Sequence, residues 1–233
     1  MSRTRGPNTY WDSTALFWRK FLEPYDGLQD QNLALQFCFP NPDKTKKGTY
    51  HMLGMECSIS SIEGIEKVVS QLRDQKVDTY FEVGLHKMES NKVCAPRKKS
   101  TEKEIVAISS MCLDLDWHDG EITKERRDKE TRAFFKVCRE RGISDPDLVV
   151  RSGQGFWFHL ILKKPTLIDD SNRELLKKER AEFLNCLAEW SQEVGGPSVD
   201  PAVFNLDRLC RCPGTYHRNG MEVDFTINRS QNK

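Results

Sequence analysis

The sequence is organised around one stretch, Met111-Cys112-Leu113-Asp114-Leu115-Asp116-Trp117-His118-Asp119, which follows the apolar run Ile105-Val106-Ala107-Ile108. The apolar run predicts a core strand, and two carboxylates stand where that strand should end. Because successive side chains of a strand point to opposite faces, Asp114 and Asp116 share one face, roughly 7 Å apart. The leucine before each aspartate points the other way, into a core.

Two carboxylates on one strand can form a platform for metal ions. Hard divalent cations such as Mg²⁺ take oxygen ligands, and two-metal sites hold their ions about 4 Å apart, a spacing that a pair of i, i+2 carboxylates can bridge. An isolated Asp-x-Asp is more often only the solvated end of a strand. The choice between these interpretations therefore depends on the rest of the chain.

The composition is that of a globular protein, with 37% aliphatic and aromatic residues and 30% charged residues among 233. This length favours a single mixed domain with an elaborated N-terminus. The net charge of +1 does not indicate a nucleic-acid partner, but basic residues cluster at 44–47 and 97–103, while acids collect at 114–121. Basic segments beside an acidic pocket suit a phosphate-bearing polymer, although such lysine runs are usually solvated faces.

Cellular location is inferred from what the N-terminus lacks. It has no apolar core of a signal peptide, and no segment approaches the length of a membrane span, so we expect a cytoplasmic protein without a membrane partner. Its eight cysteines are then expected to be reduced. Cys210-x-Cys212 followed by His217 is a weak zinc pattern, and because the chain has no Cys-x-x-Cys pair we do not expect zinc.

The rest of the chain alternates predicted helices and strands. We expect helices in the first 30 residues, from Ser60 or Ser61 to about Gln75, and over 124–141 and 175–194. Strands are expected over 33–39, 79–85, 147–151, 156–162 and 222–227. The polar and basic segment 86–104 is expected to be a mobile arm. This order, with a hairpin in the middle, predicts an α+β fold with a mixed or antiparallel sheet.

A glycine-rich turn, Arg151-Ser152-Gly153-Gln154-Gly155, joins the two strands of the predicted hairpin. Its backbone amides can approach an anion closely because glycine has no Cβ, and Arg151 and Ser152 add a positive charge and a hydroxyl. The turn can therefore hold a triphosphate, although a plain hairpin uses the same residues. On the outgoing strand Trp157 and His159 share one face, so His159 can look toward the ligand.

A third candidate metal ligand, Asp200, follows a helix break, and Asp207 is its nearest competitor. Three carboxylates are a typical complement for two divalent ions that also bind substrate phosphates. Downstream, Arg208 and Arg211 lead into Cys212-Pro213-Gly214-Thr215. Guanidinium groups can form bidentate hydrogen bonds with triphosphate oxygens, so these arginines could bind a nucleotide. The alternative interpretation of the segment is an ordinary turn with two surface arginines.

Three ordered segments together resemble the archaeo-eukaryotic primase superfamily, and within it the primase-polymerases of plasmids, phages and mobile elements. They are Leu113-Asp114-Leu115-Asp116-Trp117, Arg151-Ser152-Gly153-Gln154-Gly155 with its outgoing strand, and Asp200-Pro201 followed by Arg208-Leu209-Cys210-Arg211-Cys212-Pro213-Gly214-Thr215. The resemblance implies a catalytic core over 78–228, with an RRM-like half carrying the carboxylates. Residues 1–77 would be an N-terminal elaboration packed on that core in one compact domain.

The resemblance also implies roles for individual residues. Asp114, Asp116 and Asp200 would be catalytic and hold two Mg²⁺ or Mn²⁺ ions, with His159 as a further catalytic residue. Contacts to the nucleotide would come from Arg151, Ser152, Gly153, Gln154, Gly155, Arg208, Arg211 and Thr215. The chain departs from the family pattern at one point, because the family histidine usually stands two residues after the second glycine, where this sequence has Trp157.

The implied activity is template-dependent transfer of a nucleotide from a nucleoside triphosphate, ribo or deoxyribo, to a 3′-hydroxyl on DNA. Its partners would be a single-stranded DNA template and primer, and a helicase or further domains of the same replication system. Lys98, Lys99 and Lys103 are the candidate DNA contacts, together with the basic residues of 44–47. Two other classes stay open: a non-catalytic replication-initiator domain that binds nucleic acid, and a metal-dependent nuclease.

Overall fold

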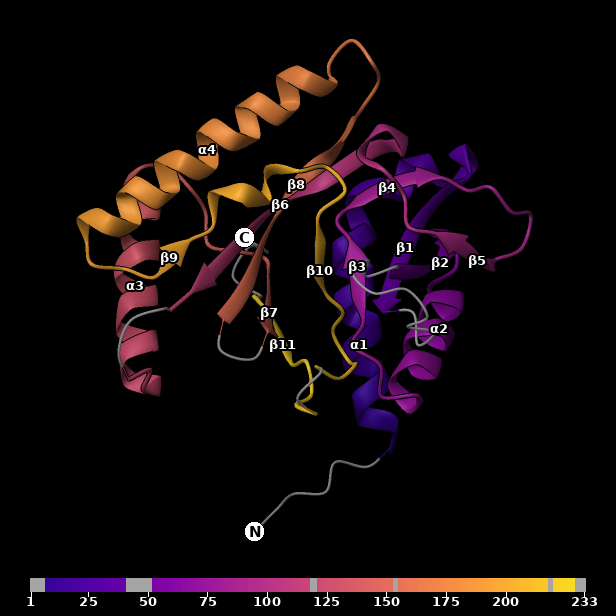
Figure 1. The fold of residues 1–233 in the computed structure, drawn as a ribbon, viewed down its shortest axis with the longest axis horizontal. Coiled ribbons are helices and arrows are strands. Elements are labelled where there is room, and N and C mark those ends of the chain that lie inside the picture. Colours follow the sequence, from indigo (N-terminus) through magenta and orange to yellow (C-terminus); the bar gives the residue numbers. More distant parts are fainter. Residues whose placement is uncertain (1–6, 41–51, 118–120, 153–154, 218–219, 229–233) are drawn as a thin grey trace, which may run out of the picture.

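The computed structural model describes residues 7–40, 52–117, 121–152, 155–217 and 220–228. These residues form an eleven-stranded sheet flanked by four α-helices, and every pairing between its named strands is antiparallel (Figure 1). The α+β architecture expected from the sequence is thereby confirmed. Among the described residues, no helix combines the length and the apolarity that crossing a membrane requires.

The strand that carries Asp114 and Asp116 lies near the middle of the sheet. The strand order is β10 (Leu209–Arg211), β3 (Tyr80–Glu82), β1 (Leu33–Pro40), β4 (Gly84–Lys87), β6 (Ile105–Asp116), β8 (Gly155–Leu167), β7 (Leu148–Ser152) and β11 (Phe225–Ile227). Off this path, β2 (Met52–Ser58) pairs with β1 and with β5 (Cys94–Lys98), and β9 (Ser198–Val199) pairs with β6. The elements before residue 78 thus belong to the same sheet as those after it.

The register between β6 and β8 decides which side chains meet. Asp114 lies opposite Trp157, and Cys112 lies opposite His159. Side chains that face each other across two strands share one face of the sheet, and so do residues two apart on one strand. These four side chains therefore form two successive pairs on the same face.

One face of the sheet is covered by the aromatic helix expected near the N-terminus. Helix α1 (Pro7–Leu22) buries Phe17, Trp18 and Phe21 completely, and the ring of Phe21 lies 5.8 Å from that of His159. Helix α2 (Ile62–Asp74) packs against α1 and begins, as expected, at Ser61, whose hydroxyl accepts a hydrogen bond from the Gly64 amide at 3.1 Å. Both helices confirm the sequence-based expectation.

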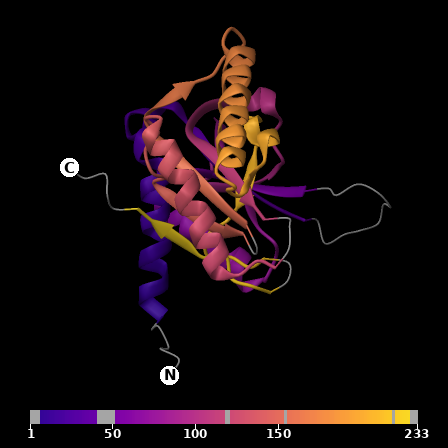
Figure 2. The same cartoon turned by 90° about the vertical axis from the view of Figure 1, so that its left-hand side faces the viewer.

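The opposite face is covered by α3 (Lys124–Glu140) and α4 (Arg173–Glu193), which contact each other (Figure 2). The ring of Phe135 on α3 lies 4.9 Å from that of Phe158. Phe158 is the chain neighbour of His159 on β8, and neighbouring side chains of a strand point to opposite faces. Helices α1 and α3 therefore sandwich this part of the sheet.

The expectation of a mobile arm over 86–104 is wrong. This segment contains the end of β4, strand β5 paired along its length with β2, and a short 3-10 helix, Glu102–Glu104. Its central basic residue is paired inside the fold: the guanidinium of Arg97 is buried and contacts the carboxylates of Glu104 and of Glu56 on β2. Polarity in this segment thus reflects ion pairs inside the fold, which composition alone does not distinguish from a solvated loop.

Candidate active site

The carboxylates of β6 meet the start of the hairpin strand β8. Asp114 is 9% exposed and Asp116 lies at the end of the strand. A Cβ added to Gly155 would lie 2.0 Å from Oδ1 of Asp116 and 2.9 Å from the backbone oxygen of Leu115. The absence of a side chain at Gly155 therefore lets the start of β8 lie directly against the Asp116 carboxylate.

The third predicted carboxylate, Asp200, is brought to the same place by the pairing of β9 with the end of β6. Its backbone amide donates to the carbonyl of Asp114 at 3.0 Å, and its side chain accepts a hydrogen bond from the Ala202 amide at 2.9 Å. The competing residue Asp207 forms an ion pair with Lys99 at 2.8 Å. The structure thus places Asp200, and not Asp207, beside Asp114.

Arg208 connects two of these carboxylates. Its Nη2 lies 3.7 Å from Oδ2 of Asp114 and 3.6 Å from Oδ2 of Asp200. The guanidinium carbon lies 5.1 Å from the centre of the Trp157 ring, within the range of a cation–π interaction. The guanidinium of Arg208 therefore lies between two carboxylates and over the ring of Trp157, which the β6–β8 register places opposite Asp114.

The pKa of Asp114 reflects its burial first and the negative charge of its neighbours second. Burial, and then the neighbouring charge of Asp116, raise its pKa from 3.8 to about 7, while Arg208 acts in the opposite direction and Asp200 adds to the rise. Oxygen donors of this kind suit Mg²⁺ or Mn²⁺. The position of the Arg208 guanidinium between Asp114 and Asp200 supports a metal-ion site here, because it shows that these carboxylates stabilise a positive charge.

Of the other predicted nucleotide contacts, Arg211 lies near the site but is already paired. It forms an ion pair with Asp78 and lies 4.3 Å from the centre of the Tyr80 ring. Its charge also lowers the pKa of Asp114, so it contributes to the field of the site. Asp78 and Tyr80 are not recognisable as partners from the sequence, because nothing local indicates that β10 pairs with β3.

Two predicted contacts do not lie at the site, and the expectations for them are corrected. Arg151 pairs with Phe156 across the hairpin, which puts it on the face opposite Asp114, where it is exposed and 3.6 Å from Asp224. Thr215 is completely buried and its hydroxyl donates to the carbonyl of Cys212 at 2.8 Å. The side chain of Thr215 is therefore not available to a nucleotide held at the carboxylates, and that of Arg151 starts from the other face of the sheet.

The remaining residues of the turn are described only in part. Ser152 ends β7 and pairs with Gly155. Gly153 and Gln154 lie outside the described residues, as do the lysines of 44–47. The phosphate-binding role of this turn stays a prediction.

His159 does not lie at the open end of the site. It is completely buried, its Nδ1 is 3.0 Å from the hydroxyl oxygen of Ser110, and burial lowers its pKa to about 3. The residue opposite Asp114 is Trp157. The expectation that His159 faces the ligand is therefore corrected: strand register places Trp157 there and His159 one step deeper.

The basic residues proposed for DNA differ in their surroundings. Lys98 and Lys103 are exposed, whereas the ammonium group of Lys99 is paired with Asp207. Exposure leaves the ammonium groups of Lys98 and Lys103 accessible to a phosphate backbone, and their DNA-binding role stays a prediction.

No family model and no curated protein matches the sequence. The structure is similar to the primase-polymerase domain of cyanophage S-2L, with a TM-score of 0.53 and 13% identity over 92% of this chain and 89% of that one. Two others are the catalytic domain of the primase RepB′ in complex with initiator DNA (TM-score 0.45, 14% identity, 94% and 86% covered) and the Mycobacterium tuberculosis ligase D polymerase domain in complex with DNA (0.48, 12%, 94% and 80%). At such identities the likeness shows the fold alone.

Proposed function

We propose that this chain, which has the fold of an archaeo-eukaryotic primase-polymerase, is a divalent-metal-dependent nucleotidyltransferase that extends a strand on a DNA template. The observation that carries the proposal is the approach of Asp200 and Arg208 to Asp114, next to Asp116 and the Gly155 turn. Two carboxylates of β6 lie there with Asp200, which precedes the 3-10 helix Pro201–Phe204, and with Arg208, which precedes β10. Such a set matches what phosphoryl transfer requires.

In the proposed reaction the protein positions groups and balances charge. Asp114, Asp116 and Asp200 would hold two Mg²⁺ or Mn²⁺ ions, which when bound supply a lowered pKa for the attacking 3′-hydroxyl and neutralise the leaving pyrophosphate. Arg208, held over Trp157, would exchange its carboxylate contacts for oxygens of the triphosphate. No side chain needs to act as a nucleophile, because positioning and electrostatic stabilisation account for most of such catalysis.

The DNA template would be guided by exposed basic residues, of which Lys98 and Lys103 are the candidates among the described residues. Binding that depends on phosphate contacts weakens steeply with salt concentration. Replacing both lysines with alanine is therefore expected to flatten the salt dependence of binding to single-stranded DNA, measured by fluorescence anisotropy. An unchanged slope would remove them from the proposal.

The proposal is tested by primer extension and de novo priming with Mg²⁺ or Mn²⁺, using ribo- and deoxyribonucleoside triphosphates in separate reactions. The intact chain is expected to incorporate nucleotides, and the double variant Asp114→Ala, Asp116→Ala is expected to incorporate none. A matched control is Asp128→Ala, which removes an exposed acid of α3. Incorporation that survives the double substitution would overturn the assignment.

A non-catalytic domain that binds nucleic acid is the second candidate, and the burial of His159 is the observation that favours it. Such a protein would bind DNA in the same anisotropy assay and incorporate nothing with either metal. Degradation of labelled DNA without added triphosphates would instead indicate a nuclease. The same reaction mixtures therefore separate the three classes.

A further inference from the structure

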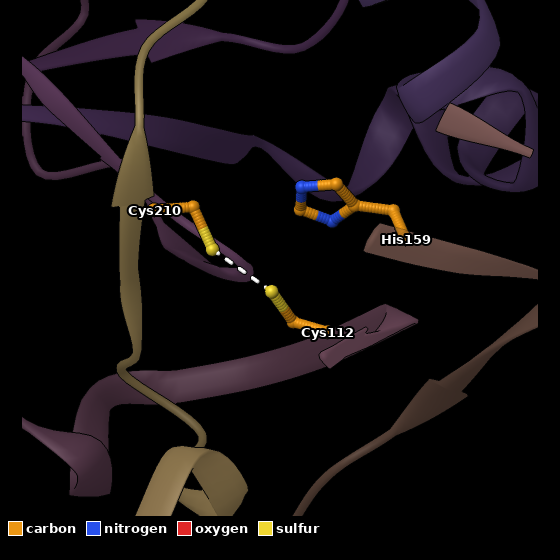
Figure 3. Close-up of side chains that lie close together, drawn as sticks. All are labelled: Cys112, His159 and Cys210. Atoms are coloured by element: carbon orange, nitrogen blue, oxygen red, sulfur yellow. Dashed lines mark hydrogen bonds between the residues drawn. The ribbon is translucent and has the colours of Figure 1, made fainter. Parts of the chain in front are cut away.

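A second group of chemically reactive side chains lies deeper on the face of the sheet that carries Asp114. It consists of Cys112 on β6, His159 on β8 and Cys210 on β10 (Figure 3). One potential ligand atom from each lies within 4.8 Å of the others, and all three residues are completely buried. The two sulfur atoms are 3.1 Å apart. We call these three residues the sulfur layer.

The imidazole of His159 is oriented toward the two sulfurs. Figure 3 shows its nitrogen-bearing edge facing Cys112 and Cys210. Its Nδ1 is held by the hydroxyl of Ser110 at 3.0 Å, and its buried Nε2 has no hydrogen-bond partner among the described residues. A metal-binding histidine is usually fixed through one ring nitrogen while the other binds the metal, and Nε2 is the nitrogen that the Ser110 contact leaves free. A buried nitrogen without a partner is otherwise unfavourable.

We propose that the sulfur layer binds one zinc ion. Two thiols and an imidazole are soft or borderline donors, which favour zinc over the magnesium or manganese that carboxylates select. Binding would release one proton from each thiol, and two thiolates with a neutral imidazole balance the charge of Zn²⁺. A neutral complex suits a core that water does not reach. With three protein ligands, the fourth tetrahedral position would be taken by a single water molecule enclosed in the core together with the ion.

The thiol of Cys210 would become a thiolate only when a metal ion binds. Burial raises the pKa of Cys210 well above its ordinary value, so without a cation this residue holds its proton. A bound metal ion deprotonates a coordinating thiol. The guanidinium of Arg180 also acts on both cysteines and donates to the Ser110 carbonyl at 3.2 Å, which adds a fixed positive charge beside them.

The position of the sulfur layer gives the proposed ion a structural role. Each residue of the sulfur layer lies two positions along the chain from a residue of the candidate active site. Cys112 pairs in this way with Asp114 on β6 and His159 with Trp157 on β8, and Cys210 of β10 pairs with Arg208, the residue just before that strand. Side chains two residues apart on a strand point to the same face. One ion would thus tie together the three segments whose mutual placement sets the distances among Asp114, Trp157 and Arg208.

This grouping differs from the zinc pattern considered in the sequence, which joined Cys210 to Cys212 and His217. The structure instead groups Cys210 with residues from two other strands. Cys212 is completely buried like Cys210, but its thiol contacts the carbonyl of Pro213. It therefore serves as a matched control that is a buried cysteine outside the sulfur layer.

The first test measures the zinc content of the purified full chain after equilibration with zinc and dialysis against excess Mg²⁺, which competes only for the carboxylates. We expect about one zinc per chain in the wild type and in Cys212→Ser, and at least a tenfold lower content in Cys112→Ser and Cys210→Ser. Zinc retained equally by both ligand variants would overturn the proposal.

The second test uses the wild-type chain alone, so it holds even where a cysteine variant fails to fold. Cobalt(II) bound in place of zinc is expected to give a sulfur-to-cobalt charge-transfer absorption and the visible bands of tetrahedral coordination. A folded chain that shows neither, or a Cys112–Cys210 disulfide found by mass spectrometry in protein purified under reducing conditions, would overturn the proposal. Neither test contains nucleotide or DNA, so its outcome is independent of the proposed activity.

Discussion

Two groups of side chains lie one step apart on the same face of the sheet and differ in almost every chemical respect. The outer one, which we call the open layer, comprises Asp114, Trp157 and Arg208, and the inner one is the sulfur layer of Cys112, His159 and Cys210. The Arg208 side chain of the open layer is 27% exposed, whereas all three residues of the sulfur layer are 0% exposed. The backbone of one set of strands therefore presents charged oxygen and nitrogen groups at its end and neutral soft donors inside.

The comparison shows how access to water selects the chemistry. Burial acts on both layers with opposite sign: it raises the pKa of Asp114 to about 7 and lowers that of His159 to about 3. In both cases the neutral form is favoured. The open layer can still carry charge because Arg208 lies between Asp114 and Asp200, while the sulfur layer is neutral and could hold thiolates only with a bound cation.

The largest expected effect comes from removing one charge of the open layer without changing its shape. Asp114→Asn is expected to lower the rate of nucleotide incorporation by at least about 100-fold, because a metal ligand matters at least as much as its supporting contacts. The control is Asp128→Asn on α3, which should keep the wild-type rate. Single-turnover primer extension measures both, and a rate for Asp114→Asn within tenfold of wild type would contradict the role of Asp114.

The next largest effect is expected at Arg208, which alone bridges two carboxylates of the site among the described residues. Arg208→Ala should lower kcat/KM for the nucleotide by about 10- to 100-fold, mainly through KM. Arg208→Lys keeps the charge but loses the planar fork, so it should recover only part of that loss. Arg211→Ala is the comparison, since Arg211 is paired with Asp78, and it should raise KM less. Equal effects of the two alanine variants would refute this ranking.

A smaller effect is expected at the boundary between the turn and the carboxylates. In Gly155→Ala the new methyl group would meet Oδ1 of Asp116 and the backbone oxygen of Leu115, and the backbone oxygen cannot move aside easily. We expect a loss of about 1–3 kcal/mol in the free energy of unfolding, as for overpacking elsewhere. Mg²⁺ affinity should fall by about tenfold because Asp116 is displaced.

Gly142→Ala is the control for Gly155→Ala. Gly142 has a positive φ of 85°, and a Cβ added there would meet no heavy atom of the described residues within 4 Å. Its substitution therefore strains the backbone without a steric clash, after the end of α3 and away from the carboxylates. Both variants should lose stability in urea denaturation, but only Gly155→Ala should lose Mg²⁺ affinity in calorimetric titration. A loss of affinity in both would show that the effect does not arise from contact with Asp116.

Much of the fold follows from local pattern, and the helices illustrate why. The aromatic spacing of Phe17, Trp18 and Phe21 and the cap at Ser61 lie within a few residues, and both are read correctly from the sequence. Strands β2 and β5 are missed because their polar side chains are stabilised by partners far along the chain, as Arg97 is by Glu56. Only knowledge of the strand pairing reveals that such residues are inside.

The same distinction applies to the site. The order of the motifs is sufficient to pick Asp114, Asp200 and Arg208, which the structure brings together. The order of the motifs does not predict the position of His159, because a strand pattern shows which face of the sheet a residue occupies but not how far it lies from the open end of that face. Depth is set by the register of β6 against β8 and by the aromatic cover from α1, and neither is local.

For each step of one pH unit, the smallest expected effect is the pH dependence that Asp114 gives to the stability of the metal-free protein. Between about pH 4 and pH 7 the native state holds a proton on Asp114 that the unfolded state has lost, since the native pKa is raised from 3.8 to about 7. This contribution to stability therefore falls as the pH rises and is gone above pH 7. The slope is on the order of 1 kcal/mol per pH unit. The measurement is urea denaturation of wild type and Asp114→Asn in EDTA at several pH values. The difference between their free energies of unfolding isolates Asp114, because the titration of His159 and other buried groups is common to both proteins and cancels.

Excess Mg²⁺ distinguishes this interpretation from an unrelated pH effect. A cation bound by the carboxylates stabilises their charged form, so the difference in unfolding free energy between wild type and Asp114→Asn should lose its dependence on pH between 4 and 7 at saturating metal. Zinc bound only to the sulfur layer should leave that dependence in place, because its ligands are not carboxylates. A difference that is flat in EDTA would mean that Asp114 titrates normally, and the open layer would then lack the burial and neighbouring negative charge that make it a candidate cation site.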